Sequence, residues 1–196
     1  MNRTWLQEQI KSYLHDSTVD AQLDTWIDIA AGRVSQGLRC WEMEQELVRA
    51  AGSAENYIDL GTTTRQILGV QWQNNSGAYT NLQSVPRHDA GLYKRNGQPC
   101  VYLVEDRKVW PLPMIDGNYK AQVIQDVVIP AGLETTPALT AYPFLFLNAA
   151  LAEAYDWKQD PEMMARMEQK WQSEADMITK TYLSERVGDT PAMRAV

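Results

Sequence analysis

Residues that could do chemistry are few in this sequence of 196 residues. Its only two histidines, His15 and His88, each stand beside an aspartate, and nothing around them matches a nucleophilic triad, a phosphate-binding loop or a zinc helix. His15 follows an expected helix end, where an imidazole can cap free carbonyl groups, and His88 lies in a polar loop after Pro86. For both histidines a structural role is favoured over catalysis.

One set of charged residues has the composition of a metal-dependent nuclease: Asp89, Asp106 and Lys108. Nucleases of the restriction-enzyme type place an acid ahead of an acid-x-lysine strand, to hold Mg²⁺ and to stabilise charge. Asp106, however, stands at the expected tip of a hairpin, where aspartate is a common turn residue. The turn is the favoured interpretation, and a Mg²⁺-dependent nuclease stays open as the enzymatic alternative.

Net charge, cysteine content and hydropathy disfavour several classes of function. The net charge is −7 and the pI is about 4.9, which disfavours a stand-alone nucleic-acid binder. Cys40 and Cys100 have no partner at metal-ligand spacing, so both are expected to be buried and reduced, and no metal or other cofactor is expected. The sequence has no apolar run long enough to cross a membrane and no signal-peptide pattern at the N-terminus, so no membrane association is expected.

The chain divides into three zones, of which the first, residues 1–43, is predicted to be helical. Thr4 can cap a first helix that ends near His15, and a second helix is expected to begin near Val19 or Asp20. Its apolar residues recur at steps of three and four. They are Leu23, Trp26, Ile27, Ala30, Val34, Leu38 and Trp41.

The second zone, residues 44–129, alternates as antiparallel strands do. Segments 44–50 and 57–60 predict one hairpin. A strand over 65–73 runs into a strong turn at 74–77, and a further hairpin turns at Asp106-Arg107. The remaining predicted elements are a short helix within 86–95 and a strand over 119–129.

The third zone, residues 130–187, is predicted to contain two helices. Residues 143–157 are apolar on nearly every side, and Pro143 suits the first position of a helix. Asp160-Pro161-Glu162 then begins a second helix with a cap, a proline at its first position and a carboxylate facing the helix dipole. Because the link is short, the two helices are expected to pack antiparallel. Glu153, on the apolar helix, needs a partner such as Arg33 or Arg39.

These patterns predict an α+β fold: a helical bundle built from residues 1–43 and 130–187, an inserted antiparallel β lobe at 44–129, and an extended C-terminal tail at 188–196. The 143–157 helix is expected at the centre of the bundle. One set of residues is expected to form the bundle core and a possible subunit interface: Trp26, Phe144, Leu147, Leu151, Met164, Met167, Trp171 and Ile178.

The order of several segments resembles one protein family. These segments are TrpIleAspIleAlaAlaGlyArg at 26–33, TyrIleAspLeu at 57–60, Tyr102 to Pro113 followed by Tyr119, and TyrProPheLeuPheLeuAsnAlaAlaLeuAlaGluAlaTyr at 142–155 with the AspProGlu helix that carries Trp171. Together they resemble the head-to-tail adaptor (connector) proteins of tailed bacteriophages. The resemblance covers roughly Leu6 to Leu183 and involves fold elements, not a catalytic signature.

The resemblance implies a structural protein of the virion without enzymatic activity. Similar adaptors form cyclic homo-oligomers, here a dodecamer, with the portal protein above and a distal tail, nozzle or tail-fibre protein below. Double-stranded DNA would pass through without sequence-specific binding, and the protein would reside in the host cytoplasm before assembly. The implied portal-docking tail comprises Gly188, Asp189, Thr190, Pro191, Ala192, Met193, Arg194, Ala195 and Val196. A stand-alone module that binds another phage or host protein remains a further alternative.

Overall fold

The computed structural model describes residues 1–16, 18–53, 55–74, 76–93 and 97–188, with the backbone alone for the last two. The chain divides into two compact units. The helical unit joins Met1–Met43 to Asp126–Val196, and the β unit is Glu44–Gln125.

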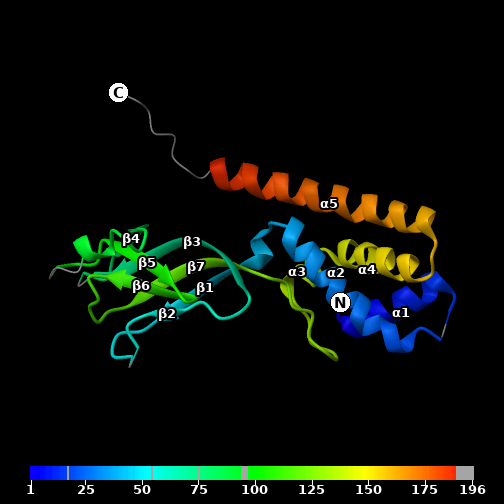
Figure 1. Cartoon of the computed structure of the whole chain (residues 1–196), viewed down its shortest axis with the longest axis horizontal. Coiled ribbons are helices and arrows are strands. Elements are labelled where there is room, and N and C mark those ends of the chain that lie inside the picture. Colours follow the sequence, from blue (N-terminus) through cyan, green and yellow to red (C-terminus); the bar gives the residue numbers. More distant parts are fainter. Residues whose placement is uncertain (17, 54, 75, 94–96, 189–196) are drawn as a thin grey trace. The chain divides into compact units, whose positions relative to one another are not determined.

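Helices from both ends of the sequence build the helical unit (Figure 1). In its described residues they are α1 (Arg3–Leu14), α2 (Asp20–Gly37), the 3-10 turn η1 (Trp41–Met43), α3 (Pro137–Ala141), α4 (Pro143–Trp157) and α5 (Pro161–Gly188). α5 runs alongside α4, as Figure 1 shows. Because the link between α4 and α5 is short, the two helices pack antiparallel, as expected from the sequence.

Helix α4 forms the centre of the helical unit. It contacts α1, α2, α3 and α5, and eight of its fifteen residues are buried. The buried residues are Leu145, Phe146, Leu147, Ala149, Ala150, Leu151, Ala152 and Ala154. The helix predicted for 143–157 is thus confirmed, and its lack of a polar face follows from having neighbours on most sides.

Local side chains set where the helices begin. Asp160 caps α5 as predicted, because its carboxylate accepts a hydrogen bond from the Met163 amide at 3.1 Å. α1 is capped by Asn2, whose side-chain oxygen accepts from the Trp5 amide at 3.0 Å, so the prediction of Thr4 as the cap is wrong by two residues. α2 ends at Gly37, so Trp41 lies beyond the helix and is 45% exposed. Helix α3 was not predicted.

A seven-stranded sheet forms the β unit. Its described strands are β1 (Glu44–Arg49), β2 (Ile58–Asp59), β3 (Thr64–Gln73), β4 (Tyr79–Ser84), β5 (Val101–Glu105), β6 (Lys108–Leu112) and β7 (Tyr119–Gln125), with the 3-10 turn η2 (Ala90–Tyr93) before β5. Their order across the sheet is β1-β7-β3-β4-β5-β6-β2. The end strands β1 and β2 contact each other, so the sheet curls into a nearly closed barrel.

This sheet shows that the predicted fold class, a helical bundle with an inserted antiparallel β lobe, is wrong. The sheet is mixed, because β4 and β5 pair in parallel through Gln83↔Val101 and Ser84↔Tyr102. The chain between them crosses over before entering β5, which a local alternation pattern cannot reveal. Over the residues that the structure describes, the fold is a nearly closed seven-stranded barrel together with five α-helices.

The predicted hairpin between 44–50 and 57–60 is also wrong. β1 pairs with β7, through Leu47↔Ala121 among others, whereas β2 pairs with β6 through Ile58↔Val109. The two segments therefore lie at opposite ends of the strand order. Closeness in sequence suggested a pairing, but the partner of each strand is distant in sequence.

The predicted turn at 74–77 and the predicted hairpin at Asp106-Arg107 are confirmed, whereas strand β4, which follows the first turn, was not predicted. β3 and β4 pair in antiparallel fashion across the turn at 74–77, where the Asn74 side chain accepts a hydrogen bond from the Ser76 amide at 2.9 Å. β5 and β6 pair across Asp106 and Arg107, which have φ angles of 51° and 58°. Two successive residues of positive φ match the twist of the flanking strands. The short helix expected within 86–95 is η2.

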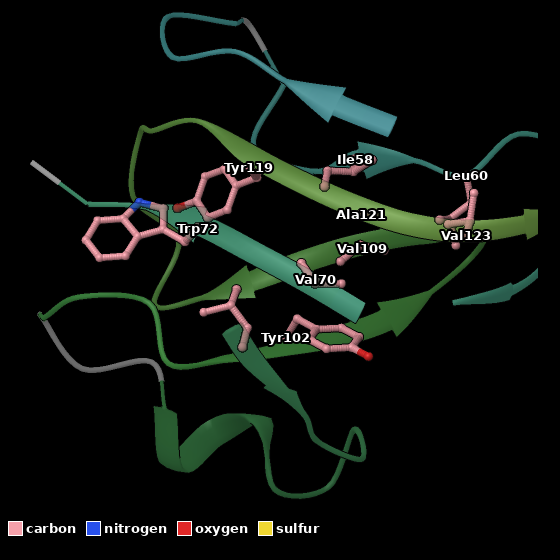
Figure 2. Close-up of a cluster of buried hydrophobic side chains, with 10 residues drawn as sticks. Ile58, Leu60, Val70, Trp72, Tyr102, Val109, Tyr119, Ala121 and Val123 are labelled. Carbon is pink, nitrogen blue, oxygen red and sulfur yellow. The ribbon is translucent and has the colours of Figure 1, made fainter. Parts of the chain in front are cut away.

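Apolar side chains on or next to strands β2 to β7 meet inside the barrel (Figure 2). Trp72 of β3 and Tyr119 of β7 face each other across one ladder and lie side by side at one end of this cluster. The other members are Ile58, Leu60, Val70, Leu82, Tyr102, Val109, Ala121 and Val123. The β unit therefore has a core of its own.

Candidate functional site

The residues of the nuclease alternative have separate neighbours. Asp106 occupies the β5–β6 turn, and the Lys108 ammonium lies 4.1 Å from the centre of the Tyr57 ring. Asp89 lies 3.6 Å from the imidazole Nε2 of His88. Within the part of the chain that the structure describes, no three His, Cys, Asp or Glu residues are grouped so as to hold a metal ion. The turn interpretation of Asp106 is confirmed.

The isolated histidine and cysteines also have local explanations. His15 is the C-cap of α1, with a left-handed φ of 48°, as its position at a helix end indicated. Cys40 is buried, and burial, followed by the nearby Glu42 carboxylate, raises the pKa of its thiol to about 12. Cys100 is exposed, so the expectation that both cysteines are buried is wrong for this one.

One arginine joins three helices of the helical unit. The Arg33 guanidinium of α2 pairs with Glu153 of α4 and, at 2.6 Å, with Glu168 of α5. It also lies 5.5 Å from the centre of the Trp171 ring. Burial alone would lower the pKa of Arg33, but the two carboxylates raise it above its ordinary value. The predicted pairing of Glu153 with Arg33 is confirmed, and its role is to fasten the helices together.

The residues expected in the bundle core do not all lie there. Trp26, Leu147, Leu151, Met167 and Trp171 are buried, whereas Met164 and Ile178 are half-buried. Phe144 is 56% exposed, and its ring packs edge-on against Trp5 at 6.2 Å between centroids. A side chain at the first turn of an apolar helix looks like core in the sequence, yet here it lies at the surface.

Several large apolar side chains of the helical unit are exposed. Trp157, at the end of α4, packs against Trp26 at 5.7 Å between ring centroids but is still 51% exposed. The others at or above two-fifths exposure in this unit are Met1, Tyr13, Ile29, Trp41, Val128, Leu133, Phe144, Met177 and Leu183. Exposed aromatic and methionine side chains are enriched at protein–protein interfaces, whereas scattered aliphatic ones are ordinary.

A groove of about 310 Å³ lies beside the last turns of α5. Its lining residues come from α5, from the start of η1 with the residue before it, and from the α3–α4 junction: Cys40, Trp41, Tyr142, Met177, Ile178, Thr181, Tyr182 and Glu185. The Trp41 and Tyr182 rings meet edge-on at 5.0 Å, and the indole nitrogen of Trp41 donates a 3.0 Å hydrogen bond to Glu185. The groove thus has aromatic walls with a carboxylate between them.

Acidic groups dominate the electrostatics of this groove. Burial, together with the charges of Glu42 and Glu185 and with Cys40, raises the pKa of the Tyr142 phenol to about 12. One carboxylate oxygen of Glu42, Oε2, is fully buried and has no hydrogen-bond partner. The guanidinium of Arg186 donates a 2.6 Å hydrogen bond to the Tyr182 hydroxyl. Such a site favours a positively charged group.

A second groove, of about 580 Å³, lies in the β unit between its end strands β1 and β2. Arg49 stands at its edge with a guanidinium that is almost fully buried. It donates hydrogen bonds to the backbone carbonyl oxygens of Glu55, Gly117 and Ser53, and to the side chains of Asn56 and Asp116. Because these bonds occupy the guanidinium, Arg49 holds the neighbouring loops in place and is not available to a ligand.

Only the beginning of the predicted portal-docking tail belongs to the described residues. Gly188 is the last residue of α5, so the tail begins directly from a helix. Asp189, Thr190, Pro191, Ala192, Met193, Arg194, Ala195 and Val196 lie outside the described residues. None of the described helices is long and apolar enough to cross a membrane.

Large apolar side chains are exposed in the helical unit, and two of the catalytic candidates, Asp106 and His15, occupy a turn and a helix cap. The family model described as SU10 adaptor protein matches residues 1–195, so the chain belongs to this adaptor family. Membership makes it a structural adaptor of the bacteriophage virion, which associates with other head and tail proteins. No curated protein matches the chain.

Proposed function

We propose that the protein is a head-to-tail adaptor that forms a ring between the portal and the tail. Copies of the chain associate as a cyclic homo-oligomer, a dodecamer, and the ring binds the portal protein on one side. A distal tail, nozzle or tail-fibre protein attaches on the other side. Before assembly the protein resides in the host cytoplasm. The family match over residues 1–195 is the observation that carries the proposal.

Exposed aromatic side chains of the helical unit support the ring. Phe144 and Trp157, at opposite ends of α4, are each more than half exposed, and both already pack against another aromatic ring. A cyclic ring uses two different surface patches per subunit, one for each neighbour. Aromatic side chains anchored in this way lose little conformational freedom when a partner covers them. We assign the two ends of α4 to the two patches.

In this proposal the segments have separate tasks. Residues 1–43 and 130–187 form the contacts between neighbouring subunits, and residues 44–129 provide the surface for the distal partner. The tail at 188–196 docks on the portal. It leaves the end of α5, and its Met193, Arg194 and Val196 offer both apolar and charged groups. Short segments of this kind can bind as extended peptides.

The ring also surrounds a passage for double-stranded DNA. The net charge of −7 keeps phosphate backbones from adhering, because binding of DNA depends on neutralising phosphates with lysine and arginine. DNA therefore slides through the ring without sequence-specific contacts. Retention of DNA on a purified ring at physiological salt would contradict this part of the proposal.

Mixing the full-length protein with its portal protein tests the ring directly. Native mass spectrometry should show the portal with a full complement of adaptor subunits. Phe144→Ser and Trp157→Ser should each leave the chain folded, since both residues are exposed, but should reduce ring occupancy. Val104→Ser, which changes an exposed apolar residue of the β unit, serves as the matched control and should leave occupancy unchanged.

Removal of residues 189–196 separates the docking of the tail from ring formation. The shortened chain should bind the portal more weakly while its circular dichroism stays that of the full-length protein. A full-length chain that remains monomeric on the portal, or that ignores it, would overturn the proposal and favour a stand-alone binding module.

A further inference from the structure

The groove beside the last turns of α5 has the features of a site for a cationic side chain. Three aromatic residues, Trp41, Tyr142 and Tyr182, line it together with Glu185. A guanidinium or ammonium group gains from aromatic faces and from a carboxylate at the same time. Lining by Cys40, Met177 and Ile178 adds apolar surface for the stem of such a side chain.

A second, independent observation is a buried carboxylate oxygen next to two lining residues of the groove, Cys40 and Tyr142. The Oε2 atom of Glu42 is fully buried without a hydrogen-bond partner, and Glu42 lies close enough to Tyr142 and Cys40 to raise both of their pKa values. Buried carboxylate oxygens without a partner are costly and rare. Arg186 lies 5.7 Å from the centre of the Tyr182 ring, so one aromatic residue of the lining already contacts a guanidinium.

We propose that this groove binds Arg194 of the chain's own C-terminal segment, with Met193 on the apolar part of the groove. Arg194 is the only basic residue among the eight that follow Gly188. Its neighbours Met193, Ala195 and Val196 are apolar, which matches the composition of the lining. The partner of the groove is thus the segment that continues α5.

The length of this segment fits the distance it must cover. The α5 residues that line the groove, Met177 to Glu185, precede Gly188 by at most 11 positions, or about 17 Å along the helix axis. Arg194 lies six positions after Gly188, and an extended chain of six steps spans up to about 20 Å. Since the segment is tethered to the groove, its effective concentration is in the millimolar range, so even a weak contact is populated.

If Arg194 docks in the groove, the C-terminal segment binds to its own chain before assembly and to the portal after assembly. The groove holds the C-terminal segment against α5 until a stronger binding site competes for it. This consequence rests on the proposed docking of the tail on the portal, whereas the intramolecular contact itself does not. The two can therefore fail separately.

Paramagnetic relaxation in the full-length chain tests the contact. Cys100→Ser removes the exposed thiol, and Val196→Cys provides a site for a nitroxide, while Cys40 is buried and stays unlabelled. In the free protein the amide signals of Thr181, Tyr182 and Glu185 should lose most of their intensity. The amide signals of α1 should keep their intensity, and they serve as the control for non-specific broadening.

Charge variants then test the chemistry of the contact. Arg194→Ala and Glu185→Gln should each restore the lost signal, with the bound population falling roughly threefold, as for a partly exposed ion pair. Arg194→Lys should retain part of the broadening. Glu162→Gln, which removes an equal charge from the first turn of the same helix, is the matched control and should change nothing.

The remaining outcomes overturn the inference. Broadening that appears when a labelled chain is mixed with an isotope-enriched, unlabelled chain would assign the groove to the tail of a second copy. Absence of broadening would show that the segment is free and that the groove serves another partner. Broadening that survives Arg194→Ala undiminished would show that the cation does not drive binding. Portal binding by the same variants, measured separately, reports on the proposed function alone.

Discussion

Each unit of this protein contains an arginine with many partners, and the partners differ. In the helical unit, Arg33 pairs with the carboxylates of Glu153 and Glu168, so one side chain from each of three helices meets at a single point. In the β unit, Arg49 donates mainly to backbone carbonyl oxygens of the loops around β1. At these two arginines, the helical unit is joined through side-chain partners and the β unit mainly through backbone partners.

This difference has a physical origin. Helices satisfy their own backbone hydrogen bonds, so contacts between them depend on side chains. Loops between strands leave carbonyl groups without partners, and a buried arginine with five donors can satisfy several of them at once. We therefore expect the helical unit to respond to changes in side-chain size and charge, and the β unit to respond to loss of backbone partners.

The largest effect is expected at the centre of the helical unit. Leu151→Ala removes a fully buried side chain of α4, which contacts four other helices, and should lower the free energy of unfolding by about 3 kcal/mol. Phe144→Ala, an exposed position on the same helix, should cost less than about 1 kcal/mol. Urea unfolding followed by circular dichroism measures both. Equal costs would show that α4 is not the centre of this unit.

The two arginines provide the next test. Arg49→Met should cost about 2 kcal/mol or more, because buried carbonyl oxygens lose their donor, and adding Asp116→Asn should not restore the loss. Arg33→Met should cost about 1 kcal/mol, since the Arg33 side chain is 39% exposed, and adding Glu153→Gln should recover part of it. Urea unfolding of the single and double variants gives the coupling free energy of Arg49 with Asp116 and that of Arg33 with Glu153. If the second substitution recovers stability in both units, or in neither, the two arginines do not differ in the kind of partner that they need.

An intermediate change in stability is expected at Gly117 of the β unit, where Trp72 leaves no room for a side chain. A Cβ atom on Gly117 would lie 2.8 Å from the indole nitrogen of Trp72, so Gly117→Ala should destabilise by about 1–3 kcal/mol. In the helical unit, Gly32 has open space around the same position, and Gly32→Ala should stabilise by about 1 kcal/mol. Thermal unfolding followed by circular dichroism should therefore show changes of opposite sign. A neutral Gly117→Ala would mean that Trp72 moves aside freely.

What could be predicted from the sequence follows the same division. Helix α4, the Asp160 cap of α5 and the pairing of Glu153 with Arg33 were predicted correctly, because apolar spacing and capping are local signals. The turn at 74–77 and the hairpin at 106–107 were predicted for the same reason. The parallel β4–β5 pair, and the partners of β1 and β2, depend on contacts between distant segments that no local pattern encodes.

Candidate binding surfaces were harder to predict than the fold. Phe144 has the same spacing as the core residues of α4, and only the packed structure shows that neighbouring helices leave it exposed. The groove beside α5 combines η1 with the α3–α4 junction, and neither α3 nor the position of Trp41 outside α2 was expected. Its one sequence signal, Glu185 close to the end of an aromatic-bearing helix, is too common to identify a site.

The smallest expected effect concerns two aspartates, one in each unit. A side-chain hydrogen bond from Thr18, followed by its amide and by Lys158, lowers the pKa of Asp16 to about 2. The amide of Gly52, and then Arg49, lowers the pKa of Asp116. Because both pKa values are depressed by folding, the stability that the carboxylates contribute is fully present above about pH 4 and is lost as the pH falls through the folded pKa.

Carboxyl-carbon NMR titration distinguishes the two causes. Thr18→Ala should raise the pKa of Asp16 toward its ordinary value, because a side chain provides the leading hydrogen bond. Arg49→Met should raise the pKa of Asp116 only in part, because the Gly52 amide, at 2.9 Å, remains. If Thr18→Ala leaves the pKa of Asp16 at about 2 and Lys158→Met raises it, Lys158, at 3.1 Å, controls it instead. The helical unit would then stabilise this carboxylate by charge, as it stabilises Glu153, and the β unit would still do so through its backbone.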